Sequence, residues 1–567
     1  MITGMTARVR QEPRGAARPR TPRRPRLPAL LALLVGVAGV GYRLALLLAD
    51  APPANSDEAT MGLAALHIAR GQDFPVWFYG QAYMGTLEAY LAAPLLALTG
   101  PSVLALRLPT LALYALFLLL VWRLTRRLGG DRWFALLIVG FLALGSDRIV
   151  KNQLIAGGGY PELNPAGVGL ALLTLDLCTG RPDARLPRWA AWGLISGLML
   201  WVDPLLLPYI AGTGAVLVAW RRRELAGRAG IVTVAALLLG AAPMLLDSLR
   251  HGRDPFTAVL AASGGDAAAG WGERLHGGLV LGPPLGMGFC SPGHCATWQL
   301  WWALAFPVLL ALAGLSAWRA LRPAASPAPP AGPPMSVPPP ARPPRSVPPP
   351  AGSPAAPSPS ATPPPSAVSA AVRLALVVGA AAVLGAYVAS SAAGRTPVES
   401  ARYLSCLAVA TPALLWPLRA ATRGGRGVPR IAAVAVLAAL LGTAAVATAA
   451  AVRTVPATHA EADRHRTLVA TLDELGVRHV RAGYWTCNRL TFASGEDVLC
   501  AVVDDELRPG FDRYPAYRRA VDADPGAGWV APVGSPLAVR LDQRLGPDRG
   551  ELDVVTVEGW RVYLPRR

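Results

Sequence analysis

Two adjacent carboxylates, Asp57 and Glu58, follow the first long apolar stretch of the sequence. They begin the run 59–70, whose composition predicts a helix, and acidic residues favour a helix N-terminus. A helix cap needs only one carboxylate, whereas a second one beside a membrane surface is costly unless it is used. The pair is therefore also a candidate general base or metal site, and the residues by themselves leave both interpretations open.

A further carboxylate, Glu162, ends the segment Gly159-Tyr160-Pro161-Glu162 just before another apolar run. Asp147 and Lys151 lie nearby as alternatives. A solvated helix start after a proline also explains Glu162 in purely structural terms. Its position at the start of an apolar run makes it the second candidate acid of a site.

One arginine, Arg402, precedes an apolar run in the segment Glu399-Ser400-Ala401-Arg402-Tyr403. A guanidinium is planar, keeps its charge and binds phosphate oxygens through two nitrogens, so Arg402 is a candidate phosphate ligand. Arginine and tyrosine also anchor helices at membrane boundaries, which is the structural alternative.

The elements that must position these side chains are membrane helices. Hydrophobic residues make up 53% of the 567 residues and charged residues only 16%, with a mean hydropathy of +0.38. This balance excludes a soluble globular protein and a disordered one. The net charge of +19 comes almost wholly from arginine, since Lys151 is the only lysine.

A membrane-spanning helix needs about 20 apolar residues. The run 190–201 is short for a span, and we interpret it as one arm of a hairpin that turns at Asp203-Pro204. We predict a polytopic α-helical membrane protein with about 11 spans, from the apolar runs 27–49, 104–122, 133–145, 163–177, 190–201, 205–220, 231–246, 300–318, 374–390, 404–418 and 431–452.

Arginine-rich connectors set the predicted topology. With these spans, all of them fall on the same side as the basic N-terminus. The positive-inside rule assigns that side to the cytoplasm. We therefore expect a multi-pass plasma-membrane protein with a cytoplasmic N-terminus and an extracytoplasmic C-terminal domain.

Composition also predicts the domain organisation. In the C-terminal part, the run 461–476 predicts an amphipathic helix, and 498–503 and 554–557 predict strands of a small α/β domain. In chain order we expect a basic cytoplasmic N-terminus (1–26), a membrane core with catalytic outer loops (27–322), a disordered proline-rich cytoplasmic linker (323–366), the remaining transmembrane helices (367–453) and the extracytoplasmic domain (454–567).

Four of the six cysteines fall into two neighbouring pairs in segments expected outside the membrane, Cys290 with Cys295 and Cys487 with Cys500. Disulfides form in that compartment. A metal site formed by Cys290, His294 and Cys295 is the alternative for the first pair, but it lacks a fourth ligand, so we favour a disulfide.

The first outer loop carries the most specific pattern. After Asp57-Glu58 come Gly80-Gln81-Ala82-Tyr83-Met84-Gly85, a short apolar run 90–98 that predicts an interfacial helix, and Ala105-Leu106-Arg107-Leu108-Pro109, where the chain re-enters the membrane. This order resembles the GT-C superfamily of membrane glycosyltransferases, particularly the bacterial relatives of the protein O-mannosyltransferases and of the lipid A aminoarabinose transferase.

The resemblance implies roles for the acidic residues. Asp57 would be the catalytic base that activates the acceptor, and Glu58 would orient it or share a divalent cation with it. No other cofactor is expected. Glu162 would be the second catalytic acidic residue. The residues expected at the substrate are Gln81, Tyr83 and Glu88.

The resemblance also implies the donor, which in this superfamily is a sugar on a polyprenyl phosphate. Basic residues expected on the outer side are few, so each is a candidate for its phosphate. Arg402 and Tyr403 match the family's arginine–tyrosine signature. The further candidates are Arg250, His251 and Lys151.

We therefore predict an inverting transferase that moves the sugar to an extracytoplasmic glycan, lipid or protein, with no nucleic-acid partner. One alternative is a transporter or flippase of a lipid-linked sugar, which should bury charges near the bilayer midplane. Only Arg43 and Asp176 approach that position, and both are near span ends. A second alternative is an inactive carbohydrate-binding relative. Aromatic clusters at 484–485 and 514–517 could stack on sugar rings or pack a core.

Overall fold

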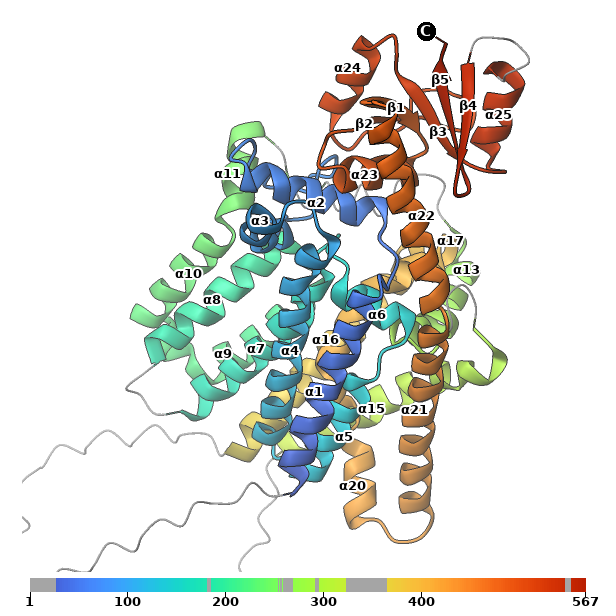
Figure 1. The fold of residues 1–567 in the computed structure, drawn as a ribbon. Coiled ribbons are helices and arrows are strands. Elements are labelled where there is room, and N and C mark those ends of the chain that lie inside the picture. The colour runs from blue at the N-terminus through green and yellow to red at the C-terminus, as the bar shows by residue number, and fades with distance from the viewer. Residues whose placement is uncertain are drawn as a thin grey trace, which may run out of the picture.

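The computed structural model describes residues 27–180, 185–252, 254, 257, 269–290, 295–322, 365–545 and 552–566. It contains a bundle of long helices that carries a small mixed domain at one end (Figure 1). The basic segment 1–26 and nearly all of the predicted linker 323–366 lie outside the described residues.

Seven helical segments of the described chain are long and apolar enough to cross a membrane, and two bent helix pairs raise the number to nine if each pair is one span. The predicted count of about 11 is therefore not confirmed. The two remaining predicted runs lie in α7 (Tyr160–Thr179) and α8 (Arg185–Val202). Both are helices, but polar residues at their ends lower their hydropathy.

The helices of these seven segments include α1 (Leu27–Leu48), α4 (Val103–Arg127), α9 (Leu207–Leu225), α15 (Trp301–Leu321), α16 (Pro365–Ala389), η5 (Ala401–Ala410) with α19 (Thr411–Leu414) and α20 (Trp416–Gly424), and α21 (Val428–Arg453). The bent pairs are α5 (Arg132–Ala143) with α6 (Asp147–Leu154), at 90°, and α10 (Arg228–Gly240) with α11 (Ala242–His251), at 62°.

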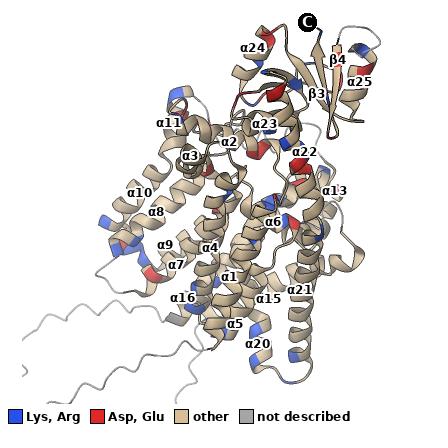
Figure 2. Ribbon diagram, viewed as in Figure 1, with Lys and Arg blue, Asp and Glu red and all other residues tan. Residues whose placement is uncertain are grey.

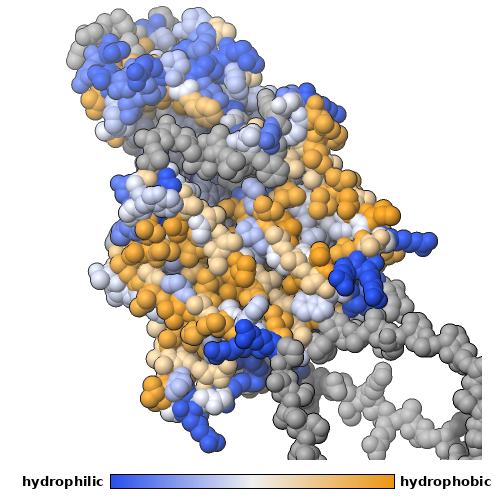
Figure 3. All heavy atoms as spheres, turned by 180° about the vertical axis from the view of Figure 1, so that it is seen from behind, coloured by the Kyte–Doolittle hydropathy of each residue, from blue (hydrophilic) through white to orange (hydrophobic). Residues whose placement is uncertain are grey.

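The surface of the bundle is that of a membrane protein. Large apolar side chains point outward from its helices, for example Leu33 and Val37 on α1 and Ile231 on α10, which are 63%, 61% and 72% exposed. Figure 3 shows this hydrophobic surface over the bundle and a hydrophilic surface over the C-terminal domain. Such a contiguous apolar surface requires lipid around it.

The predicted hairpin at Asp203-Pro204 is present. The Asp203 carboxylate accepts a hydrogen bond from the Leu205 N–H and starts a short 3-10 helix, η2 (Pro204–Leu206), which leads into α9. At the opposite end of the two helices, Arg185 of α8 forms an ion pair with Glu224 of α9. The two arms are therefore antiparallel.

Short helices cover one end of the bundle, which we call the loop face. They are α2 (Ser56–Ala69), whose first turn is capped by the Asn55 side chain, and α3 (Leu87–Thr99), the predicted interfacial helix. Figure 1 shows α2 and α3 between the long helices and the C-terminal domain. Asp57 and Glu58, at the start of α2, thus lie at the boundary between the helical bundle and the C-terminal domain.

The C-terminal domain is a five-stranded mixed sheet with helices, which agrees with the predicted α/β class, although only the strands at 499–502 and 552–557 were predicted. The strand order is β2-β1-β3-β5-β4, with β1 parallel to β2 and β3, and β5 antiparallel to β3 and β4. The strands are β1 (His479–Ala482), β2 (Leu499–Val502), β3 (Gly528–Pro532), β4 (Leu552–Val557) and β5 (Trp560–Pro565), and the helices are α22 (Val455–Glu474), α23 (Tyr484–Ala493), α24 (Pro515–Ala523) and α25 (Pro536–Leu545).

Both neighbouring cysteine pairs form disulfides. Cys487 and Cys500 tie α23 to β2 inside the C-terminal domain, and Cys290 and Cys295 close a short loop before α15. Cys178 and Cys406 are free and buried.

Candidate active site

Asp57 meets two side chains of the C-terminal domain. Its Oδ1 accepts a hydrogen bond from the Tyr484 hydroxyl at 2.5 Å and one from the Arg513 guanidinium at 3.0 Å. Arg513 Nε also donates to the Tyr484 oxygen at 2.7 Å. Among the described residues Oδ2 has no hydrogen-bond partner, and the side chain is 22% exposed. One oxygen of Asp57 is thus fixed while the other remains available.

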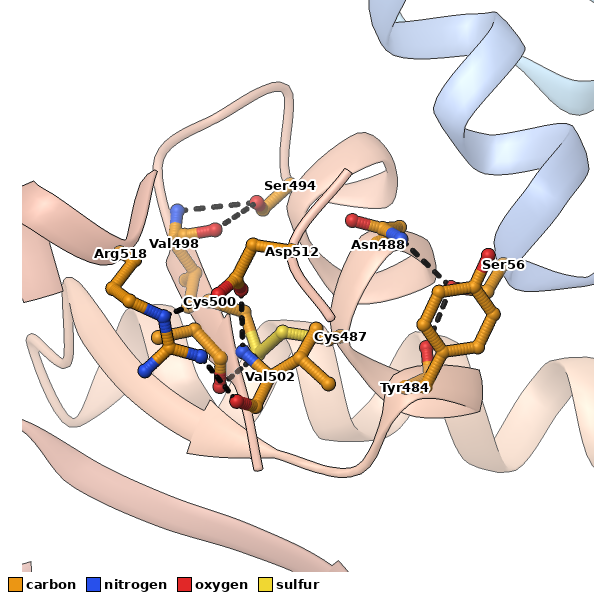
Figure 4. Close-up of a disulfide and its surroundings, with 11 residues drawn as sticks. Ser56, Tyr484, Cys487, Asn488, Ser494, Val498, Cys500, Val502, Asp512 and Arg518 are labelled. Carbon is orange, nitrogen blue, oxygen red and sulfur yellow. Dashed lines mark hydrogen bonds and ion pairs between the residues drawn. A yellow bond between two sulfur atoms is a disulfide. The ribbon is translucent and has the colours of Figure 1, made fainter. Parts of the chain in front are cut away.

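The start of α23 places Tyr484. The Ser56 hydroxyl donates to the Tyr484 carbonyl at 2.6 Å and accepts from the Asn488 amide at 3.0 Å. Figure 4 shows these contacts beside the Cys487–Cys500 disulfide, which holds the same helix to β2. Helix α23 therefore lies against the first turn of α2 with little freedom.

Arg513 is buried among aromatic rings. Its guanidinium carbon lies 4.7 Å from the ring centre of Phe78 and 5.3 Å from that of Phe511.

Burial raises the pKa of the Tyr484 hydroxyl, and the negative charge of Asp57 raises it further. Tyr484 is consequently a neutral hydrogen-bond donor to Asp57 at physiological pH.

Glu58 points away from Asp57, because adjacent residues of a helix do not share a face. Both of its carboxylate oxygens accept hydrogen bonds from Arg107, at 2.6 Å each, and the pair is buried. Arg107 also donates to the Pro52 carbonyl at 2.8 Å. This bidentate pair fixes the start of α2 against α4.

The two acids do not fit a resident divalent cation. Arg107 occupies both oxygens of Glu58, and Arg513 places a second positive charge beside Asp57. Within the described residues no group of three or more histidine, cysteine, aspartate or glutamate side chains could hold a metal ion.

Glu162 and Glu88 form a buried carboxyl pair on the loop face. The backbone N–H groups of Gly158 and Gly159 donate to Glu88 at 3.3 Å each. Burial raises the pKa of Glu88 well above its ordinary value, and the charge of Glu162 raises it further. Asp203 lies nearby, and burial raises its pKa to about 7. Such a cluster retains protons near neutral pH, because like charges this close disfavour ionisation.

Arg402 supplies a further positive charge, in addition to that of Arg513. Its guanidinium carbon lies 5.6 Å from the ring centre of Tyr403 and 5.9 Å from that of Tyr160. It acts electrostatically on Asp57 and Asp203, yet it forms no ion pair among the described residues, and its Nε has no hydrogen-bond acceptor. A half-buried guanidinium without a counter-ion is a ready anion site.

Tyr83 interacts electrostatically with Tyr403, Arg513 and Arg402. Burial raises the pKa of its hydroxyl, the neighbouring Tyr403 raises it further, and Arg513 and Arg402 lower it. The neighbouring Gln81 joins a backbone turn to Phe78, and its side chain makes no hydrogen bond within the described chain. Tyr83 is thus the predicted loop residue that the structure brings into the site.

The remaining basic candidates lie in other surroundings. Lys151 of α6 forms an ion pair with Asp147 at 3.0 Å. His251 pairs with Asp247 on α11 at 3.0 Å, and Arg250 is exposed on the same helix. None of the interactions between described residues joins these three side chains to Asp57 or Arg402. Their role as phosphate ligands stays a prediction.

Sequence reasoning missed Tyr484 as a partner of Asp57, and it missed Arg513 and Asp203. Tyr484 lies in an aromatic cluster that we considered for sugar stacking, and Asp203 was recognised only as part of a turn. Arg513 gave no signal, because arginine is common in the C-terminal domain and only the fold brings it to the first loop.

A second set of contacts fastens the C-terminal domain to α2. His67 accepts or donates hydrogen bonds with Tyr79 at 2.7 Å and Glu496 at 2.9 Å. Arg70 pairs with Glu496, and the Tyr517 hydroxyl donates to Glu496 at 2.7 Å. These contacts give His67 a structural role.

No protein-family model and no curated protein matches this sequence. Among solved structures, ArnT from Cupriavidus metallidurans bound to undecaprenyl phosphate superposes with a TM-score of 0.52 at 15% identity, over 95% of this chain and 97% of that one. The same protein in the apo state gives 0.50 at 16% identity over the same shares.

This chain has the GT-C fold. The similarity extends over 95% of this chain, and it therefore includes residues of both the bundle and the C-terminal domain. At this identity the likeness concerns the fold, and the resemblance noted in the first loop is confirmed at that level. The roles of individual residues rest on the contacts described above.

Proposed function

We propose that the protein transfers a sugar from a polyprenyl-phosphate donor to an extracytoplasmic acceptor. The observation that supports this proposal concerns Arg402 and Asp57. Arg402 forms no ion pair among the described residues and interacts electrostatically with Asp57, whose side chain is 22% exposed. An anion site beside a candidate base matches the two needs of glycosyl transfer from a phosphate, which are a bound leaving group and a proton acceptor.

The proposed reaction is a single displacement. The acceptor hydroxyl gives its proton to Asp57 Oδ2 while its oxygen forms a bond to C1 of the sugar. The bond between C1 and the phosphate oxygen breaks, and the lipid phosphate leaves with the electron pair, neutralised by Arg402. One displacement inverts the configuration at C1. The buried carboxyl groups of Glu88 and Glu162 line the site but do not accept the proton of the acceptor hydroxyl.

The C-terminal domain takes part in this site through Asp57. Tyr484 and Arg513 bind Oδ1 and so direct Oδ2 towards the acceptor. Two aromatic side chains next to them, Trp485 and Phe511, are 63% and 56% exposed. Exposed rings beside a base are suited to hold the acceptor, whether it is a glycan, a lipid or a protein.

The proposed side of the membrane follows from charge. Figure 2 shows arginine at the ends of α9, α10 and α20, opposite the loop face, while both signs of charge occur on the C-terminal domain. The positive-inside rule then places the loop face outside the cytoplasm. That is where an acceptor of the cell envelope would be met, and it places the N-terminus of α1 on the cytoplasmic side.

The donor proposal draws support from the lipid in a similar fold. ArnT with a TM-score of 0.52 was solved with undecaprenyl phosphate. A lipid phosphate of this kind meets the chemistry of Arg402, whose guanidinium is suited to phosphate oxygens.

The transporter alternative receives less support from the buried charges. Arg43 of α1 donates to Gln153 and to the Ala143 carbonyl at the end of α5, and its guanidinium lies 3.8 Å from the ring centre of Tyr114. Asp176 pairs with Arg127 at the opposite end of the bundle. Both charges stabilise helix ends. Neither Arg43 nor Asp176 is therefore available to line a transport path.

The test compares cells that lack the gene with cells complemented by the wild-type protein or by Asp57→Asn. Mass spectrometry of envelope glycans, lipids and glycoproteins should show one sugar missing from the deletion strain and restored by the wild type. Asp57→Asn keeps the shape but removes the base, so the purified variant should lose about 10²–10⁴ in transfer rate. Near-normal transfer by this variant, at equal membrane abundance, would contradict the proposal.

A further inference from the structure

A large cavity lies where the C-terminal domain meets the loop-face ends of the bundle. It holds about 360 Å³ of space, and its walls come from the end of α1, the starts of α2 and α4, and the helices α22 and α23. A buried water needs only about 10–15 Å³, and small-molecule sites in proteins begin at about 300 Å³. The cavity is therefore large enough for a ligand.

This cavity is separate from the candidate active site. Glu58 and Arg107, which form the buried ion pair described above, line it. Asp57, Tyr484 and Arg402 are not among the described residues that line it. Because neighbouring residues of a helix do not share a face, Asp57 and Glu58 belong to different sites on the two sides of the first turn of α2.

Two more ion pairs line the cavity and join its walls. Glu461 of α22 accepts hydrogen bonds from Arg489 of α23 at 2.9 and 3.1 Å. Asp50, which follows α1, accepts two from Arg466 of α22, at 3.1 Å each. Both carboxylate side chains are 31% exposed. A ligand can therefore reach charges of both signs, in equal number.

The wall also contains a polar group that the fold does not satisfy. His465 of α22 lines the cavity and is 7% exposed, and its Nε2 has no hydrogen-bond partner among the described residues. Arg489 and Arg466 both act on it electrostatically, so the two ion pairs lie near the same imidazole. A buried polar atom without a partner costs free energy, and it is an unusual feature of a wall with no ligand to bind.

Apolar residues of two spans border the same cavity. Leu47 of α1 and Leu104 of α4 line it. Leu104 and Leu48, the residue after Leu47, are 36% and 66% exposed on the apolar surface of the bundle. The charged part of the cavity thus begins where two membrane spans end, which is the level of the lipid headgroups.

The ion pairs favour a ligand that carries both signs of charge. A ligand with one sign would take one partner of a pair and leave the other with an uncompensated charge. A ligand with a phosphate and an ammonium group supplies a partner to each arginine and each carboxylate. A primary ammonium donates three hydrogen bonds to carboxylates, whereas a quaternary ammonium donates none.

We propose that the cavity binds the headgroup of a zwitterionic aminophospholipid from the surrounding bilayer. The phosphate binds the two arginines, the primary ammonium binds the two carboxylates, and the acyl chains follow the apolar surface of α1 and α4. The lipid touches the bundle at Asp50 and the C-terminal domain at Arg489, and it joins these two parts away from Asp57. This site does not depend on the proposed function.

The experiment measures lipid binding to the purified, delipidated full-length protein in detergent by native mass spectrometry. The probes are phosphatidylethanolamine, phosphatidylcholine, phosphatidylglycerol and diacylglycerol with identical acyl chains. We expect phosphatidylethanolamine to bind about 10-fold more tightly than each of the other three. Its soluble headgroup, glycerophosphoethanolamine, should bind at least about 10-fold more weakly than the lipid, because it lacks the acyl chains that contact α1 and α4.

The variant Glu461→Gln/Arg489→Gln removes both charges of one pair at similar side-chain size and leaves neither partner charged alone. It should lose the roughly 10-fold preference for phosphatidylethanolamine. Arg481→Gln/Asp522→Asn is the matched control, because this ion pair of the C-terminal domain, at 3.2 Å, lies outside the cavity. The control should keep the preference.

A second variant, Asp50→Asn/Arg466→Gln, neutralises the other pair and does not change α23. It should also lose the preference, and it tests the proposal if the first variant fails to fold. Thermal unfolding without added lipid shows whether each variant is folded before its lipid binding is compared with that of the wild type.

Three results would overturn the proposal. If the wild type binds all four lipids equally, the cavity holds only water. If folded variants of both pairs keep the preference, the lipid binds elsewhere on the bundle. If glycerophosphoethanolamine binds as tightly as phosphatidylethanolamine, the ligand is a soluble zwitterion and the assignment to a lipid is wrong. Loss of the preference in a folded pair variant, with the control unchanged, supports the proposal.

Discussion

The Tyr484 hydroxyl and the Asp57 carboxylate, 427 residues apart in the sequence, lie 2.5 Å from each other. This contact joins the C-terminal domain to the first turn of the loop-face helix α2. A carboxylate held through one oxygen keeps a defined orientation for the other. The two parts of the protein therefore build a single site, and the following predictions separate their contributions.

Tyr484→Phe removes the hydroxyl that binds Asp57 and leaves the ring in place. We expect the maximal transfer rate to fall about 10–100-fold with undecaprenyl phosphate affinity unchanged, because a misplaced base slows the reaction without weakening donor binding. Tyr514→Phe is the control, since Tyr514 packs on His67 and Tyr79 but does not touch Asp57. If Tyr484 acts by orienting Asp57, its removal should cost nothing more in an Asp57→Asn background.

Arg402→Lys keeps a positive charge but loses the planar fork. We expect the affinity for undecaprenyl phosphate to fall about 10-fold, since a lysine offers a point charge in place of two parallel hydrogen bonds. Arg419→Lys is the control, because Arg419 pairs with Asp131 at the opposite end of the bundle. Equal affinities for the wild type and the Arg402 variant, measured by native mass spectrometry, would leave Arg402 as a membrane anchor.

Cys487→Ser/Cys500→Ser removes the tie between α23 and β2. A loop of this length contributes about 3 kcal/mol by constraining the unfolded chain, so the C-terminal domain should unfold at a lower temperature in a calorimetric scan. Tyr484 and Asn488, on the same helix, should hold α2 less firmly, and transfer should slow while lipid binding persists. Cys178→Ala, which removes a free buried thiol, controls for loss of a cysteine. Unchanged kinetics in the double serine variant would show that α2 alone positions Tyr484.

Truncation after Val452 removes α22 and the whole sheet. The remaining bundle keeps Arg402 and should still bind undecaprenyl phosphate, but it lacks Tyr484 and Arg513 and should transfer poorly to its acceptor. Deletion of residues 325–360, a stretch rich in proline, alanine and serine, is the control and should leave transfer nearly intact. Full activity of the truncated protein would show that the C-terminal domain has no part in transfer.

Local pattern was sufficient for the elements but not for the site. Apolar periodicity and turn residues gave α2, α3, the hairpin at Asp203 and two of the five C-terminal strands, β2 and β4, because each depends on neighbours in the chain. Asp57 was found through its position before a helix. Its partners were not, since hydrogen bonds between segments separated by several hundred residues leave no trace in local composition.

Sequence reasoning undervalued Arg107 and overvalued Arg250, for the same reason. Arg107 was noticed only within a short motif, whereas in the fold it takes both oxygens of Glu58. Arg250 was selected because basic residues are scarce on its side, yet it is exposed on α11. The small number of basic residues on that side limits the candidates for a phosphate ligand, but it does not tell how far each of them lies from the site.

The packing of α23 on α2 has a consequence for biosynthesis. Gly62 of α2 lies so close to Phe492 of α23 that an added Cβ would come within 2.6 Å of the ring. At a typical elongation rate, roughly 20–90 s separate the synthesis of these two surfaces. During that interval the nascent membrane protein presents an uncovered helix face, so a chain interrupted before α23 carries a ready recognition signal for chaperones and proteases.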